Sequence, residues 1–208
     1  ITAIHALGDI WAMGSDPEIA LTNIIIPESS NEIQKRTIEE IIDGANSVFG
    51  AEGVKIVGGH TSLGKEIVIG FTLGGFSKKQ PKTVDKACVG DQIILTKPLG
   101  SGVLLAGEMR FEGEGQHLKN LFDAMSQSQS SIAKVLSKVA NSMTDITGFG
   151  LAGHLLNIVS KSKVGAKLFL DQVPVYPGAK NLIAKDIRSS IFENNYMYTE
   201  KMIIKTTA

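Results

Sequence analysis

Apolar residues recur along the first part of the chain at spacings that predict alternating helices and strands. Within Thr2–Met13, and again from Ser30 or Asn31 to Gly50, they return every three or four positions, which is typical of amphipathic helices. Glu18–Ile26 is instead a short apolar run that ends at a proline, as a buried strand would. The pattern therefore predicts a helix, a strand and a second helix with a polar N-cap.

Two further strands are predicted before the polarity of the chain changes. Val54–Val57 runs directly into two glycines, and Glu66–Leu73 is rich in β-branched residues. The next segment, Ser77–Asp91, is polar and basic, so we place a domain boundary within it. The expected division is an N-terminal α/β domain over residues 1–80 and a C-terminal α+β domain over residues 81–208.

The second half of the chain also mixes the two kinds of pattern. Strands are predicted at Gln92–Thr96 and Lys167–Leu170. Helices are predicted after Gly102 and over Leu118–Met125, Ser130–Ala140, Gly150–Ser160 and Ala179–Lys185. The two halves together indicate a protein of the α/β plus α+β class.

Composition narrows the classes of partner. The 21 basic and 21 acidic side chains balance, which argues against broad electrostatic binding to nucleic acid or to anionic membranes. No apolar run reaches the roughly 20 residues that span a bilayer, and the opening residues lack the pattern of a signal peptide. The single cysteine, Cys88, allows no internal disulfide. We therefore expect a cytoplasmic protein that binds neither nucleic acid nor membrane.

Asp145 stands just before a glycine-interrupted turn that opens a predicted helix. Glycines let a backbone approach a phosphate closely, and a helix N-terminus offers free N–H groups, so this carboxylate is a candidate anion or metal site. The alternative is that Asp145 only caps the helix while the glycines form a tight turn. The local pattern leaves both interpretations open.

Two other positions are candidates for similar reasons. The glycines of Gly58–Thr61 stand at the predicted end of a strand, where ligand loops of α/β proteins lie, although an ordinary turn has the same pattern. Asp9 lies in an apolar helix with His5 one turn earlier on the same face. A carboxylate there must pair, bind a metal or face water. His154 and His117 are expected to be a structural and an exposed residue, respectively.

Taken in order, several segments resemble selenophosphate synthetases (selenide, water dikinases). They are His5–Gly14, Gly58–Thr61, Leu95–Gly100, Thr144–His154, Pro177–Ala179 and Arg188–Ser190. Together they extend over nearly the whole chain. Thr144–His154 is the most specific of them, because related ATP-binding enzymes share the first segment only loosely.

The resemblance implies a fold and a reaction. The fold is a two-domain, AIR-synthetase-like ATP-binding fold, with the N-terminal sheet completed across a homodimer. The reaction is that of a phosphotransferase, in which ATP, selenide and water give selenophosphate, AMP and orthophosphate.

The resemblance also implies roles for individual residues. Asp9 would bind Mg²⁺ and contact the nucleotide, and Asp145 would be a second Mg²⁺ ligand. Gly58, Gly59 and His60 would line the nucleotide site and reach across the dimer interface. Magnesium held by a few carboxylates and by phosphate oxygens is a common way to offset the charge of ATP during attack on phosphorus.

The chain departs from the pattern of that family at several points. Gly8 replaces a usual Ser and Ser15 a usual Gly, and both replacements are small. The family's glycine-rich segment with its catalytic Cys or selenocysteine and its Lys should precede Ile1, and a further segment should follow Ala208. We therefore expect a chain cut short at both ends, with no catalytic residue within it.

Two other interpretations remain open. One is an enzyme of the same superfamily, of the thiamine-monophosphate kinase or aminoimidazole ribonucleotide synthetase type. The other is a nucleotide-binding relative without catalytic activity.

Overall fold

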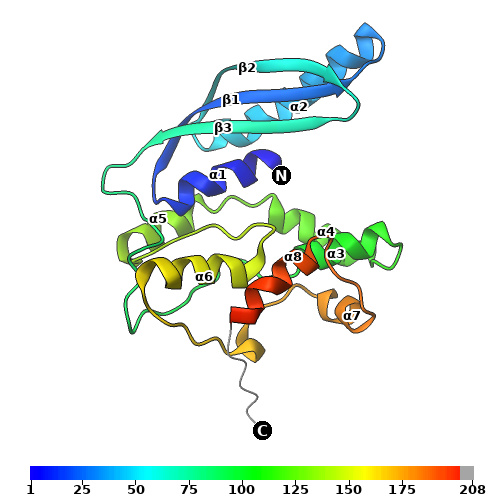
Figure 1. Cartoon of the computed structure of the whole chain (residues 1–208). Helices are drawn as coiled ribbons and strands as arrows, with labels where there is room; N and C mark the ends of the chain where they lie inside the picture. The colour runs from blue at the N-terminus through cyan, green and yellow to red at the C-terminus, as the bar shows by residue number, and fades with distance from the viewer. Residues whose placement is uncertain (202–208) are drawn as a thin grey trace. The chain divides into compact units, whose positions relative to one another are not determined.

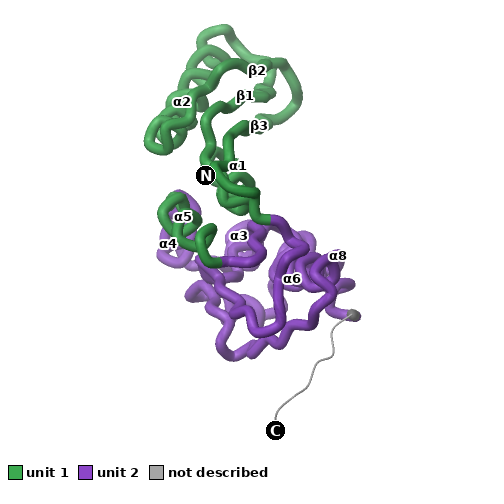
Figure 2. The backbone as a smooth tube through the Cα atoms, turned by 90° about the vertical axis from the view of Figure 1, so that its left-hand side faces the viewer, with its two compact units in different colours: residues 1–82, 127–139 green, residues 83–126, 140–208 purple. Residues whose placement is uncertain are grey.

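The computed structural model describes residues 1–201, which form two compact units (Figure 2). Unit 1 comprises residues 1–82 and 127–139, and unit 2 comprises residues 83–126 and those from 140 onward. Helix α5 (Ser130–Val139) therefore clusters with unit 1, although it is far from the rest of that unit in sequence. A division of the chain at residue 80 stays a prediction.

Unit 1 is built on a three-stranded mixed sheet (Figure 1). The strands are β1 (Asp16–Pro27), β2 (Lys55–Gly64) and β3 (Val68–Phe76), in the order β2-β1-β3. β1 pairs with β2 in parallel and with β3 antiparallel. Parallel neighbours need a crossover, which helix α2 (Asn31–Ala51) provides between β1 and β2.

One face of this sheet carries the core of unit 1. Alternate residues of β1 point to that face, where they meet helices α1 (Thr2–Ala12) and α2. The rings of Phe49 on α2 and Phe71 on β3 meet edge to face, with their centroids 5.0 Å apart. The buried residues of the cluster are Ala3, Ile4, Leu7, Trp11, Ala20, Ala45, Phe49, Val54 and Ala133.

The opposite face of the sheet exposes apolar side chains. By the register of the strands, Ile19, Leu21 and Val68 share this face, and they are 44%, 45% and 48% exposed. His60 lies on the same face, because it pairs with Asn23 of β1. A sheet with one apolar face left in water has a surface that a partner could cover. The single chain does not show a sheet completed by a second copy.

Most elements predicted for residues 1–76 are confirmed, although the ends of several differ by a few residues and one strand continues well beyond its predicted end. α2 begins where expected, and the Ser30 hydroxyl accepts the N–H of Ile33 at 3.4 Å. β2, however, does not end at Val57 but continues to Gly64. Its backbone goes on pairing with β1 after a one-residue register shift, so Gly58–Thr61 lies within a strand and not in a loop at its end.

Unit 2 is mainly helical. Its buried apolar cluster is formed by Leu104, Ala106, Leu121, Ala179, Leu182 and Ile187. The helices are α3 (Ser101–Met109), α4 (Gly115–Met125), α6 (Gly150–Ser162), α7 (Ala179–Ala184) and α8 (Phe192–Tyr196), with 3₁₀ turns η1 (Leu170–Gln172) and η2 (Met197–Lys201). The predicted helices of this half are confirmed, whereas α8 was not expected.

The two strands predicted in this half are wrong for the residues that the structure describes. Gln92–Thr96 forms no strand, and Lys167–Leu170 leads into η1. The sequence pattern was apolar, but a strand also needs a neighbour with which to exchange hydrogen bonds. Within described unit 2, strand-type pairing is limited to an isolated parallel bridge between Leu99 and Val175. In the same described residues, no helix has both the length and the apolar character needed to span a membrane.

Candidate functional site

Asp9 lies on the face of α1 that is turned away from the core. The helix buries the side chains of Ala3, Ile4, Leu7 and Trp11. Asp9 and His5 are four residues apart and both are exposed, so they share the opposite face. A Cβ added to Gly8 meets no atom within 4 Å, so the serine that is usual in the resembled family would fit there. The helix thus presents a carboxylate and an imidazole outward.

Gly58 and Gly59 of β2 differ in the room that each leaves for a side chain. A Cβ on Gly59 would lie 2.0 Å from the Thr22 Oγ1 and 2.3 Å from the Thr22 carbonyl oxygen, so only glycine permits this approach of β2 to β1. A Cβ on Gly58 would make an ordinary contact with Leu21 at 3.5 Å. Gly59 therefore has a structural reason to be glycine, whereas Gly58 and His60 are exposed on the open face of the sheet.

Asp145 does not cap a helix. α6 begins at Gly150 and its N-cap residue is Phe149, which makes no side-chain capping bond. Asp145 lies earlier, in the preceding loop, and is half-buried. Within residues 1–201 its carboxylate has no ion-pair partner. A half-buried carboxylate without an ion-pair partner is better suited to bind a cation than to stabilise the fold through an ion pair.

The loop that carries Asp145 is tied down just after it. The N–H of Thr147 donates to Nε2 of His154 at 3.2 Å, and the amide nitrogen of Asn195 donates to the Gly148 carbonyl at 2.7 Å. Gly150 closes the turn with φ of +67°, a conformation that favours glycine. The structure confirms His154 as a residue with a structural contact. It also shows Asn195, which no sequence motif singled out.

The Leu95–Gly100 segment has a packing role. The Lys97 ammonium donates to the Ala124 carbonyl at 2.6 Å, near the C-terminus of α4, and burial lowers the pKa of Lys97. Leu99 accepts the N–H of Tyr176 at 2.9 Å, which joins this segment to the one around Pro177–Ala179. These two motifs therefore hold unit 2 together and need no ligand to account for them.

His117 is half-buried, which corrects the expectation that it is exposed. Its side chain is 23% exposed and its Nδ1 lies 3.5 Å from a carboxylate oxygen of Glu114. A Cβ on Gly178 would come within 2.3 Å of that same nitrogen, so the ring packs against the glycine. Sequence could not show this contact, because the two residues are far apart along the chain.

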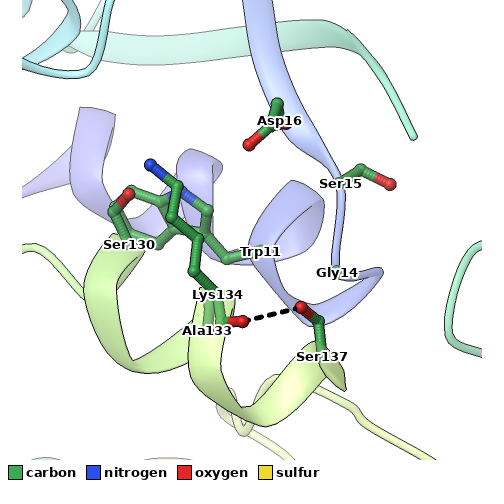
Figure 3. Close-up of a pocket in the computed structure, with 8 residues that line it drawn as sticks. All are labelled: Trp11, Gly14, Ser15, Asp16, Ser130, Ala133, Lys134 and Ser137. Atoms are coloured by element: carbon green, nitrogen blue, oxygen red, sulfur yellow. Dashed lines mark hydrogen bonds between the residues drawn. The ribbon is translucent and has the colours of Figure 1, made fainter. Parts of the chain in front are cut away.

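A small pocket in unit 1 is not the nucleotide site. It is lined by Trp11 of α1, by the residues at the start of β1 and by residues of α5 (Figure 3). Its volume of about 20 Å³ fits a water molecule and not a nucleotide. The residues that line it are Trp11, Gly14, Ser15, Asp16, Ser130, Ala133, Lys134 and Ser137. None of the predicted site residues is among them.

The predicted site residues therefore fall into two groups. Asp9, Gly58, Gly59 and His60 belong to unit 1, and Asp145 belongs to unit 2. Among the described residues, no three His, Cys, Asp or Glu side chains gather closely enough to bind a metal by themselves. Magnesium does not need such a cage, since it takes one or two carboxylates and completes its shell with water and phosphate oxygens.

Comparison with known proteins gives the family. The N-terminal domain of AIR synthase related proteins matches residues 1–77, and their C-terminal domain matches residues 89–201. A protein named selenide, water dikinase from Shewanella sp. (strain MR-4) is 33% identical over 198 residues, or 94% of this chain and 56% of that protein. The chain thus spans about half the length of the curated relatives it matches.

Solved structures share the fold. Thiamine-monophosphate kinase from Stenotrophomonas maltophilia K279a matches with a TM-score of 0.74 and 19% identity, over 96% of this chain and 70% of that one. The hydrogenase maturation protein HypE in complex with ATP matches with a TM-score of 0.69 and 19% identity, over 88% of this chain and 57% of that one. The family models together cover most of this chain, which belongs to the AIR synthase related family.

Proposed function

We propose that this protein is a selenide, water dikinase, which makes selenophosphate from ATP, selenide and water and releases AMP and orthophosphate. The observation that carries the proposal is the 33% identity over 94% of the chain to a relative of that name. The Thr144–His154 segment, with its half-buried Asp145, adds a site of the right chemistry. The structures of thiamine-monophosphate kinase and HypE, at 19% identity, support the fold alone.

Asp9 and Asp145 are the proposed magnesium ligands. When bound, the ion supplies positive charge that offsets the charge on the phosphates of ATP. Asp9 offers an exposed carboxylate on α1, and Asp145 offers a half-buried carboxylate without an ion-pair partner in the described chain. Carboxylate oxygens are the ligand type that Mg²⁺ prefers, so both residues fit the ion.

The open face of the sheet is the proposed interface of a homodimer. Ile19, Leu21 and Val68 expose apolar surface on it, and the same face carries His60. A second copy that covered this surface would bring His60 and Gly58 of one protomer to the edge of a shared nucleotide site. Burial of the apolar surface of this face would favour formation of the dimer.

The acceptor of the phosphoryl group distinguishes this proposal from the other enzymes of the fold. The full-length protein should convert ATP to AMP only when selenide is present, and thiamine monophosphate should not replace it. The assay measures AMP, ADP and orthophosphate under anaerobic conditions with each acceptor in turn. Formation of ADP with thiamine monophosphate, and no AMP with selenide, would overturn the proposal in favour of a thiamine-monophosphate kinase.

A further inference from the structure

The loop that carries Asp145 is held by two side chains from outside it. One is His154, from the second turn of α6, and the other is Asn195, from α8. Both bonds reach the backbone two or three residues after Asp145, at Thr147 and Gly148. The loop is therefore fixed on its helix side by contacts that do not involve the carboxylate itself.

The His154 contact requires a particular form of the ring. Nε2 lies 3.2 Å from the Thr147 backbone nitrogen and also 3.2 Å from the Thr147 hydroxyl oxygen. A backbone N–H can only donate, so Nε2 must be the acceptor and the ring hydrogen must be on Nδ1. The ring of Phe149 lies beside His154, with the centroids 6.2 Å apart. His154 thus fixes the direction of the Thr147 backbone N–H.

The Asn195 contact joins segments that are distant in sequence. Its amide nitrogen donates to the Gly148 carbonyl at 2.7 Å, across a separation of 47 residues. The other end of the same amide, Oδ1, is buried and has no hydrogen-bond partner among the described residues. An unsatisfied buried oxygen costs stability. A Cβ on Gly148 would lie 2.9 Å from the end of the Ile191 side chain, just before α8, which would then have to shift.

We propose that His154 and Asn195 are positioning residues, which hold the loop so that the Asp145 carboxylate is presented to the metal. This inference rests on the proposed function, in which Asp145 binds Mg²⁺. Groups that orient a metal ligand by hydrogen bonds typically change metal affinity by 10–100-fold when removed. Because these two act on the backbone near Asp145 and not on its carboxylate, we expect an effect at the lower end, about tenfold.

Asn195 offers the cleaner test, with a matched control next to it. In the full-length protein, Asn195→Leu removes the donor without adding charge, whereas Asn194→Leu makes the same change at an exposed neighbour on α8. The measurement is the Mg²⁺ concentration that gives half-maximal ATP binding, together with the thermal unfolding midpoint. Asn195→Leu should raise the Mg²⁺ requirement about tenfold, and Asn194→Leu should leave it unchanged.

His154 offers a test by rescue. His154→Leu removes the acceptor, and His154→Gln replaces it with a side-chain oxygen that can accept the Thr147 N–H. The Leu variant should raise the Mg²⁺ requirement about tenfold, and the Gln variant should recover most of the loss. If His154→Leu does not fold, the Asn195 pair decides the question alone.

The outcomes separate this inference from the proposed function. If Asp145→Asn raises the Mg²⁺ requirement but Asn195→Leu and His154→Leu lower only the unfolding midpoint, both residues are structural and the inference is overturned alone. If Asp145→Asn itself leaves the Mg²⁺ requirement unchanged, the proposed metal role of Asp145 fails, and the positioning role fails with it.

Discussion

At the scale of single residues, the proposed chemistry of the chain rests on two aspartates in different settings. Asp9 is exposed on a helix whose other face is buried, and Asp145 is half-buried in a loop before α6. The structure rules out the cap role that the sequence left open for Asp145, because the N-cap of α6 is Phe149. We therefore do not expect Asp145 to contribute to folding stability as a helix cap.

Replacement of either aspartate should affect binding. In the full-length protein, Asp9→Asn and Asp145→Asn should each weaken Mg²⁺-dependent ATP binding by about 1.5–3 kcal/mol, the scale of a lost hydrogen bond or contact to a charged group. The unfolding free energy of the Asp145→Asn variant should change by less than about 0.5 kcal/mol. Calorimetric titration with ATP, with and without Mg²⁺, measures the first quantity, and chemical denaturation measures the second.

Asp43→Asn is the matched control, because Asp43 is exposed on α2 and has no proposed role. Equal ATP affinity for wild type, Asp9→Asn and Asp145→Asn would contradict the assignment of both carboxylates. A loss that appeared for only one of them would restrict the metal site to that residue.

At the scale of elements, the sequence predicts helices well and strand pairing poorly. The helical period is local, so α1, α2 and α6 could be located from their own residues. Strand pairing is not local: β2 extends through Gly58–Thr61 because β1 lies beside it. For the same reason an apolar segment such as Gln92–Thr96 predicted a strand that has no partner in the described part of unit 2.

The candidate site shows the same limit. Asp9, Asp145 and the glycines could be picked out because carboxylates and glycines are recognisable residue types in recognisable places. Asn195 could not, since its role comes from a bond to Gly148 that spans 47 residues. The sequence pattern around Asn195 carries no signal of that contact.

Gly58 and Gly59 of β2 should respond differently to the same change. Gly59→Ala places a Cβ 2.0 Å from the Thr22 Oγ1, whereas Gly58→Ala meets only Leu21 at 3.5 Å. Gly59→Ala should lower the free energy of unfolding by about 1–3 kcal/mol, as overpacking does, and Gly58→Ala should change it by less than about 0.5 kcal/mol. Urea denaturation of the two variants measures both values, and equal destabilisation would contradict the observed strand register.

At the scale of the whole molecule, two features bear on the proposed dimer and on the proposed activity. The open face of the sheet is apolar in a single chain, and the chain matches about half the length of its curated relatives. The proposed homodimer would account for the first feature. Family membership and the 33% identity account for the proposed activity.

Dimerisation should depend on the open face. The full-length protein should sediment at twice its chain mass, and Leu21→Lys should shift it towards the monomer, because the change places a charge on that face. Phe111→Lys is the control, because Phe111 is 97% exposed and belongs to unit 2 and not to the sheet. A wild-type protein that stays monomeric at micromolar concentration would rule out the proposed interface.

The product of the proposed reaction can be observed directly. Phosphorus NMR of full-length protein with ATP, Mg²⁺ and selenide under anaerobic conditions should show selenophosphate, with AMP and orthophosphate formed in equal amounts. The same spectra should show no selenophosphate with Asp145→Asn and an unchanged yield with Asp43→Asn. A wild-type protein that consumes ATP at the same rate with and without selenide, and forms no selenophosphate, would contradict the proposed reaction.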